Sequence, residues 1–254
     1  MRDLTYPPII ATAKTLFRLR GWKVRMTGTE NIPREGGAVL ASNHIGFADF
    51  VLAGFPAERR GRLVRFMAKK EAFDHPIGGR VLRTMHHIPV DRASGAESLD
   101  AAVDYCRRGE IVGIFPEATI SRSFEIKEVK SGAPRIAAQA GVPLIPVVLF
   151  GTQRIMTKGH KLSLPRGLPI QIRVGEPLYP TGADPVAETE QLHRALQALL
   201  DEAVAAYPDA TEGQWWAPAR FGGTAPTLEE AAQLDVDERA ARAARKVAKV
   251  ANDD

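Results

Sequence analysis

The most informative part of the sequence is the stretch Ala38-Val39-Leu40-Ala41-Ser42-Asn43-His44-Ile45-Gly46-Phe47-Ala48-Asp49. Residues 38–41 form an apolar run of the kind that predicts a buried β-strand. His44 and Asp49 follow this run, and the exit of a strand is where α/β proteins commonly place reactive side chains. The stretch therefore predicts a strand that delivers a histidine and an aspartate to a functional site.

The spacing of His44 and Asp49 constrains the backbone between them. In a continuous helix, five residues at about 100° each would place the two side chains roughly 140° apart, so they would not meet. They can meet only if His44 lies in a turn and Asp49 lies in the first turn of a helix. Gly46 favours such a turn because glycine accepts backbone angles that other residues resist. An aspartate bound to one imidazole nitrogen leaves the other to act as a base, although a histidine and an aspartate at this separation also occur together by chance.

A second apolar run, residues 111–115, predicts another buried strand, and it ends in a second polar motif. Together the two stretches resemble the glycerolipid acyltransferase family, whose best-known members are the 1-acylglycerol-3-phosphate acyltransferases (PlsC-like). That family carries an Asn-His pair followed after four residues by Asp (the HX4D motif), and later a Phe-Pro-Glu-Gly-Thr motif. This chain has Asn43-His44 with Asp49, and then Phe115-Pro116-Glu117-Ala118-Thr119. Two further similar blocks are Ile88-Pro89-Val90-Asp91-Arg92 and Val142-Pro143-Leu144-Ile145-Pro146-Val147, so the resemblance covers about 21–178.

The chain departs from the family pattern at two positions. Ala118 replaces the family's usual glycine after the glutamate, and the usual arginine near Ile120 is absent. A methyl group is tolerated easily if the backbone angle at Ala118 is ordinary, but not if φ must be positive. The change bears on the identity of the acceptor more than on the chemistry, since it could narrow the acceptor pocket or move the phosphate site.

The resemblance implies roles for individual residues. His44 is expected to be the general base, oriented by Asp49. Arg92 is expected to bind the phosphate of the acceptor, because a guanidinium group offers paired N–H donors to phosphate oxygens. The other residues expected to bind the acceptor are Glu117, Ala118 and Thr119, with Lys69 and Lys130 adding positive potential. The chain has no Gly-x-Ser-x-Gly motif that would support a serine nucleophile.

The function favoured by the resemblance is O-acylation of a lysophospholipid, most simply the conversion of 1-acylglycerol 3-phosphate to phosphatidate. The cosubstrate would be an acyl-CoA or acyl carrier protein thioester. Such a reaction needs no cofactor, and the sequence has no compact zinc or iron spacing, so we expect neither a cofactor nor a metal. The alternatives are another lysophospholipid or glycolipid acceptor, a thioester or ester hydrolase, and a non-catalytic lipid-binding module.

Strands and helices alternate along the chain, which predicts an α/β fold with a mixed, largely parallel sheet flanked by helices. We expect an N-terminal amphipathic helix within 1–27, an acyltransferase domain over 28–207, and an aromatic arm with a charged C-terminal helix over 208–254. The polar segment 121–130 is expected to loop over the site, and the basic segment 154–169 to be a mobile loop. The other expected strands are 63–68, 87–90, 142–150 and 170–174, and the other expected helices include 76–85, 132–140, 185–207 and 228–250.

The composition is that of a soluble globular protein, with 254 residues of which 44% are hydrophobic and 25% charged. The longest apolar runs are shorter than the roughly 20 residues that a membrane-spanning helix needs, and no signal peptide is visible. The single cysteine, Cys106, excludes an intramolecular disulfide, suits a reducing cytoplasm and is expected to fill the core. No zinc-finger spacing or RNA-binding signature indicates a nucleic acid partner.

The distribution of charge favours contact with an anionic membrane surface. The formal net charge is +4, and basic residues crowd the first 25 positions at Lys14, Arg18, Arg20, Lys23 and Arg25. The helix expected at 9–20 could lie in the membrane interface or cap the core of its own domain. Trp215-Trp216 could likewise anchor an interface or belong to an arm packed on the domain. We therefore expect a peripheral or monotopic protein on the cytoplasmic face of the cell membrane.

Overall fold

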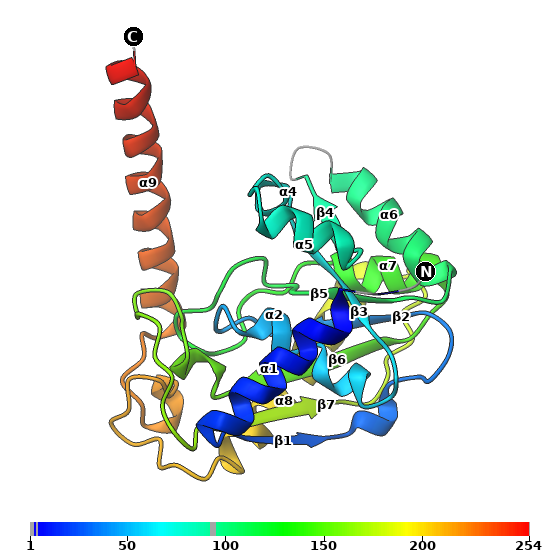
Figure 1. Ribbon diagram of the computed structural model, residues 1–254, viewed down its shortest axis with the longest axis horizontal. Coiled ribbons are helices and arrows are strands. Elements are labelled where there is room, and N and C mark those ends of the chain that lie inside the picture. Colours follow the sequence, from blue (N-terminus) through cyan, green and yellow to red (C-terminus); the bar gives the residue numbers. More distant parts are fainter. Residues whose placement is uncertain (1–2, 4, 92–94, 254) are drawn as a thin grey trace.

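A computed structural model describes residues 3, 5–91 and 95–253. Its centre is a mixed sheet of seven strands in the order β1-β7-β6-β2-β5-β3-β4 (Figure 1). All neighbouring pairs are parallel except β6 and β7, so the predicted mixed, largely parallel α/β fold is confirmed. The strands are β1 (Lys23–Thr27), β2 (Ala38–Ser42), β3 (Val64–Lys69), β4 (Ile88–Val90), β5 (Ile111–Ile114), β6 (Leu144–Phe150) and β7 (Pro169–Val174).

The strand β2 is the middle of the sheet and is buried along its whole length. It pairs with β5 on one side and β6 on the other, with Ala41 opposite Ile114 and Ser42 opposite Val147. Because these three strands are parallel, their carboxyl ends meet at one edge of the sheet, where ligand sites of open α/β sheets lie. The sheet thus brings both sequence motifs to the same edge.

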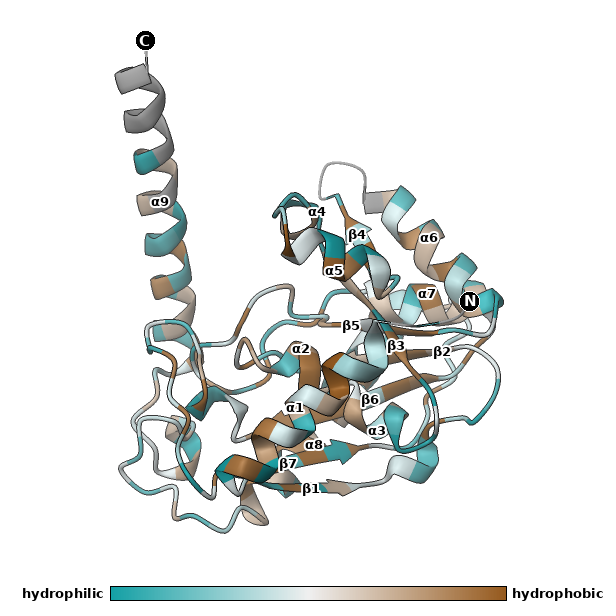
Figure 2. Ribbon diagram, viewed as in Figure 1, coloured by the Kyte–Doolittle hydropathy of each residue, from teal (hydrophilic) through white to brown (hydrophobic). Residues whose placement is uncertain are grey.

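Helices cover both faces of the sheet (Figure 1). Alternate residues of β2 point to opposite faces: Val39 and Ala41 pack in one hydrophobic cluster, Ala38 and Leu40 in another. The first cluster takes residues from α6 (Gly95–Arg107), α7 (Gly132–Ala140) and α8 (Pro185–Ala205); the second takes them from α1 (Tyr6–Arg20), α2 (Asp49–Leu52) and α3 (Phe55–Glu58). Two further short helices are α4 (Lys70–Phe73) and α5 (Gly78–Thr84). Figure 2 shows hydrophobic residues concentrated in the central strands.

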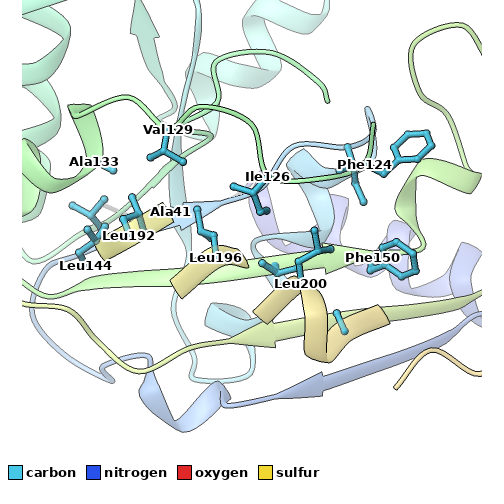
Figure 3. Close-up of a cluster of buried hydrophobic side chains, with 14 of the residues drawn as sticks. Ala41, Phe124, Ile126, Val129, Ala133, Leu144, Phe150, Leu192, Leu196 and Leu200 are labelled. Carbon is cyan, nitrogen blue, oxygen red and sulfur yellow. The ribbon is translucent and has the colours of Figure 1, made fainter. Parts of the chain in front are cut away.

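The segment 121–130, predicted to loop over the site, lies between β5 and α7 and contributes to the first hydrophobic cluster. Figure 3 shows Phe124, Ile126 and Val129 of this segment beside residues of the sheet and the leucines of α8. All three side chains are buried, at 2%, 2% and 7% exposure. The segment is therefore fixed to the sheet by its apolar side chains.

The N-terminal helix α1 packs on the domain. Ile10, Ala13 and Phe17 lie against the second hydrophobic cluster, and Phe17 stacks on Trp22 with ring centroids 4.7 Å apart. Leu16 and Leu19 of the same helix are exposed, Leu19 by 78%. The following strand β1 pairs with β7, so the sheet begins inside the 1–27 segment. Within the described ranges, no helix has the length and apolarity to cross a membrane.

The C-terminal part combines a packed arm with a projecting helix. Trp216 is 4% exposed and its ring lies 5.3 Å from that of Tyr207, whereas Trp215 is 37% exposed and stacks on His160. The arm is therefore packed on the domain at Trp216. The helix α9 (Leu228–Asp253) follows and extends away from the domain beyond its first turns (Figure 1).

Gly113 in β5 leaves no space for a side chain. A Cβ atom there would lie 2.5 Å from ring carbons of Phe66 and 2.6 Å from Val64 Cγ1. We expect Gly113→Ala to lower the free energy of unfolding by about 1–3 kcal/mol, because overpacking forces the surrounding core to shift. Urea denaturation of the purified variant measures this. The matched control is Gly132→Ala, whose Cβ would meet only Ile114 Cδ1 at 3.7 Å and should change stability by less than about 1 kcal/mol. Equal effects of the two substitutions would contradict the packing argument.

Candidate active site

His44 and Asp49 meet as the sequence predicts. His44 lies in the loop after β2, Asp49 is the first residue of α2, and His44 Nδ1 is 3.1 Å from Asp49 Oδ2. The Asp49 side chain is fully buried, whereas the His44 side chain is 20% exposed. With Nδ1 facing the carboxylate, Nε2 is the imidazole nitrogen that can act on a substrate.

The Asp49 carboxylate also shapes the loop that carries His44. Its Oδ2 accepts hydrogen bonds from the backbone N–H of Ile45 at 2.6 Å and of Gly46 at 2.7 Å. Its Oδ1 accepts a hydrogen bond from Thr152 Oγ1 at 2.5 Å. Asp49 therefore fixes the imidazole and the backbone of its loop at the same time.

Gly46 is needed for a different reason from the one the sequence indicates. Its φ lies outside the left-handed region, so the glycine is not required by its backbone angle. A Cβ atom at Gly46 would lie 3.0 Å from Met156 O and 3.1 Å from Thr152 O. The glycine instead permits close approach between the loop that carries His44 (residues 43–48) and the segment after β6.

Asn43, the residue before His44, extends the sheet with its side chain. Its Oδ1 accepts the backbone N–H of Leu149 at 2.8 Å, and its Nδ2 donates to the backbone oxygen of Leu149 at 3.0 Å. These two bonds imitate a ladder pair between β2 and β6 at the point where β2 ends. The backbone of His44 is thereby released from the sheet at a defined position.

Glu117 contacts the loop that carries His44 directly. It is 4% exposed, its Oε1 accepts the backbone N–H of His44 at 2.9 Å, and its Oε2 accepts the backbone N–H of Lys127 at 3.1 Å. Burial raises the pKa of Glu117 to about 7. The two backbone N–H donors lower this pKa, but by less than burial raises it. Both carboxylate oxygens of Glu117, which the resemblance implies bind the acceptor, thus accept hydrogen bonds from the backbone.

An aromatic stack supports the imidazole of His44. The ring of Phe115 lies 4.3 Å from that of His44, with planes 23° apart, and the ring of Phe66 stacks with that of Phe115 at 5.7 Å. The sequence identifies Phe115 only as the first residue of the second motif. Its ring is a third support for His44, besides Asp49 and Glu117.

The other predicted acceptor residues lie in or after the second motif or at the end of the strand β3, except for one outside the described part of the chain. Thr119 is near the site, since its Oγ1 accepts a hydrogen bond from Lys127 Nζ at 2.8 Å. Lys130 and Lys69 are exposed, Lys69 at the carboxyl end of β3. Arg92 lies outside the described residues.

Sequence reasoning missed Thr152, although a signal for it was present. Residues 142–150 were predicted as a strand, and Thr152 comes two residues after β6 ends at the edge where His44 lies. Cys106 is buried as expected, and burial raises the pKa of its thiol to about 12. Within the described ranges, no three His, Cys, Asp or Glu side chains are grouped as they would be to hold a metal ion.

Comparison of the chain with known proteins identifies similar proteins. The Acyltransferase family model matches residues 23–150. A 1-acyl-sn-glycerol-3-phosphate acyltransferase from Bacillus subtilis is 32% identical over 193 residues, which cover 73% of this chain and 88% of the relative.

The chain belongs to the acyltransferase family.

Two further matches extend the comparison. The chloroplastic 1-acyl-sn-glycerol-3-phosphate acyltransferase BAT2 of Brassica napus is 30% identical over 167 residues, which cover 64% of this acyltransferase and 47% of the longer plant protein. The crystal structure of the 1-acyl-sn-glycerophosphate acyltransferase PlsC from Thermotoga maritima superposes with a TM-score of 0.68 at 24% identity, covering 80% of each chain. The PlsC-like family and its fold, as the sequence predicted, are confirmed.

Ala118 marks where this acyltransferase departs from its family's motif. Its φ is +59°, the left-handed region in which glycine is favoured, and its N–H closes a turn onto Phe115 O at 3.0 Å. A non-glycine residue in this region costs on the order of 1 kcal/mol. The turn is therefore kept in spite of the alanine, with a methyl group where the family usually has none.

Thr152 is expected to act as a positioning residue for Asp49. Thr152→Val removes the hydroxyl donor and leaves a buried carboxylate oxygen without it, so kcat should fall roughly tenfold to hundredfold because a displaced base reacts poorly. The Michaelis constant for the acceptor should change little. Thr152→Ser, which keeps the hydroxyl, is the control and should retain most of the activity. Wild-type turnover in the valine variant would show that the bond to Asp49 is dispensable.

Glu117 makes the stability of the acyltransferase depend on pH. Its pKa in the folded protein is about 7, above the ordinary value of 4.5, so the folded state binds this proton more tightly than the unfolded state. Stability from this group is complete below about pH 4.5 and is lost as the pH rises through about 7, by about 3 kcal/mol at most. We expect the wild type to lose stability relative to Glu117→Gln between about pH 5 and pH 8, measured by denaturant unfolding at each pH. A difference that stays constant over this range would contradict the prediction.

Proposed function

We propose that this acyltransferase moves a fatty acyl group from a thioester donor to the free hydroxyl of a lysophospholipid, converting 1-acylglycerol 3-phosphate to phosphatidate. The observation that carries the proposal is the hydrogen bond between His44 Nδ1 and Asp49 Oδ2 at the carboxyl edge of the central strand. The names of the Bacillus subtilis and Brassica napus relatives, both 1-acyl-sn-glycerol-3-phosphate acyltransferases, support this choice of acceptor.

The reaction proceeds by direct attack of the acceptor. His44 Nε2 takes the proton of the acceptor hydroxyl as the hydroxyl oxygen forms a bond to the thioester carbonyl carbon. The resulting imidazolium is stabilised by the Asp49 carboxylate. The tetrahedral intermediate then collapses, the carbon–sulfur bond breaks, and the thiolate takes the proton from His44. No enzyme-bound acyl group forms, and no cofactor takes part.

The donor is acyl-CoA, with an acyl carrier protein thioester as the variant. The lipid substrates bring the protein to a membrane surface, which we assign to the cytoplasmic face of the cell membrane. The N-terminal helix supports peripheral binding there, because Leu16 and Leu19, three residues apart on one face of α1, are both exposed, and Arg18 is exposed elsewhere on the helix. Exposed apolar residues on one face and basic residues on another are the pattern of interfacial helices that bind anionic lipid.

Thiol release by purified protein, supplied with long-chain acyl-CoA and 1-acylglycerol 3-phosphate, tests the proposal. Release should depend on the acceptor, and His44→Ala should lower its rate about 10²–10⁴-fold, the usual contribution of a general base. Mass spectrometry of the lipid product confirms phosphatidate. The control is His193→Ala, which removes a half-buried histidine of α8 far along the chain from the motif and should leave the rate unchanged.

Two outcomes would reject the proposal. Thiol release that is equally fast without the acceptor indicates a thioester hydrolase. A rate of acceptor-dependent thiol release in His44→Ala equal to that of the wild type indicates that His44 is not the general base.

A further inference from the structure

Three cationic side chains converge on the first turns of α9. Asp235 Oδ1 accepts hydrogen bonds from Lys158 Nζ at 2.8 Å and Arg122 Nε at 3.2 Å, and Asp235 Oδ2 accepts one from Lys127 Nζ at 2.8 Å. Glu238, one turn further along α9, lies 2.9 Å from Arg122 Nη2 and 3.6 Å from Lys158 Nζ. We refer to Arg122, Lys127 and Lys158 as the cation cluster. Their side chains are only 17–22% exposed, so the cluster is largely enclosed.

Three hydrogen-bonded connections link the cation cluster to the loop that carries His44. Ser121 and Thr157 immediately precede Arg122 and Lys158 in the sequence. The three connections are Ser121 N–H to His44 O at 2.7 Å, Thr157 Oγ1 to Ile45 O at 2.7 Å, and Lys127 N–H to the Glu117 carboxylate that accepts the His44 N–H. The cluster is therefore hydrogen-bonded, through three segments of the chain, to the loop that carries His44.

The charges in this cluster match those of a phosphate ligand. The cation cluster supplies three positive charges, and Asp235 and Glu238 oppose them with two carboxylates. Burial alone would raise the pKa of Asp235, but hydrogen bonds from Lys127 and Lys158 outweigh it and lower the pKa to about 2. A phosphate monoester carries nearly two negative charges at neutral pH and three strong acceptor oxygens on a single group. Its charge therefore nearly equals that of the two carboxylates together.

We propose that the cation cluster is a binding site for the phosphate monoester of the acceptor lipid, and that Asp235 and Glu238 of α9 occupy it as an internal competitor. The inference rests on the proposed function, which supplies an acceptor of this chemistry. Among the described residues, α9 buries the small side chain of Ala231 but contributes none to either hydrophobic cluster, and it leaves the domain after its first turns (Figure 1). Displacement of its two carboxylates therefore leaves the sheet intact. The observed acceptor affinity is lowered by the fraction of molecules in which α9 fills the site.

The test compares the wild type with the double variant Asp235→Asn/Glu238→Gln, using the full chain. The matched control is Asp237→Asn, which changes an exposed carboxylate of the same helix that accepts a bond from Gln233 Nε2. Glycerol 3-phosphate is the first probe in isothermal titration calorimetry, inorganic phosphate the second, and glycerol the phosphate-free reference. The double variant should bind glycerol 3-phosphate roughly tenfold more tightly than the wild type, and the control variant should bind like the wild type.

Two additional arms define the ligand. Adding Lys127→Met to the double variant should remove the gain in affinity, because it deletes one of the three cations. In the acyl-transfer assay, the double variant should show a lower Michaelis constant for 1-acylglycerol 3-phosphate and an unchanged one for monoacylglycerol, which lacks phosphate. Tighter binding of inorganic phosphate without a change in either Michaelis constant would identify a site for free phosphate and overturn its assignment to the acceptor.

Equal or weaker binding of both phosphate probes by the double variant overturns the proposal and shows that the ion pairs only tether α9. If the double variant is unstable, a larger phosphate-induced rise in Tm than in the wild type supports the site, and an equal rise overturns it. The binding measurement needs no turnover, so the phosphate site and the proposed acyl transfer can be rejected independently of each other. Tighter glycerol 3-phosphate binding without acyl transfer rejects the proposed function but supports the anion site. Acyl transfer with unchanged binding and Michaelis constants supports the function and rejects the site.

Discussion

The buried carboxylate of Asp49 is the constraint on which the geometry of the site depends. It accepts hydrogen bonds from the His44 ring, from two backbone N–H groups of the intervening loop and from the hydroxyl of Thr152. These donors come from three places in the chain: the end of β2, the turn before α2, and the segment after β6. A buried carboxylate without hydrogen-bond donors would lower the stability of the folded protein. The need of Asp49 for these donors therefore holds the three segments together.

The parallel pairing of β2 and β5 explains how two distant motifs become one site. Their carboxyl ends lie side by side, so the loop after β5 can present Glu117 to the backbone of His44 and the ring of Phe115 to its imidazole. The histidine is therefore held at three kinds of contact: an acceptor on Nδ1, an acceptor on its main-chain N–H, and an aromatic face. Each limits a different rotation or displacement of the base, which is what preorganisation of a catalytic group requires.

The sequence predicted most of the sheet and its helices, because apolar runs mark the strands and these depend on local patterns. Polar residues at strand exits marked the candidate site, but the pairing of His44 with Asp49 was predicted only once the two motifs together resembled the acyltransferase family. The role of Glu117 could not be read in this way, since its partners are backbone N–H groups, which leave no pattern in the side chains. The reason for Gly46 was misjudged because close approach to Met156 and Thr152 depends on a segment more than 100 residues away. The ion pair of Lys158 with Asp235 joins residues 77 positions apart and is equally invisible to local reading.

The side chain of Asn43 has a consequence for how the active site forms during synthesis. Its two partners are both on Leu149, 106 residues later in the chain, and the Thr152 partner of Asp49 lies 103 residues from it. Contacts of such high sequence separation form only after the loop-closure entropy of the intervening chain has been overcome. A nascent chain that has left the ribosome only as far as α7 carries the complete His-Asp motif but lacks Leu149 and Thr152, the partners of Asn43 and Asp49. The base therefore acquires its working geometry only after β6 has been added beside β2.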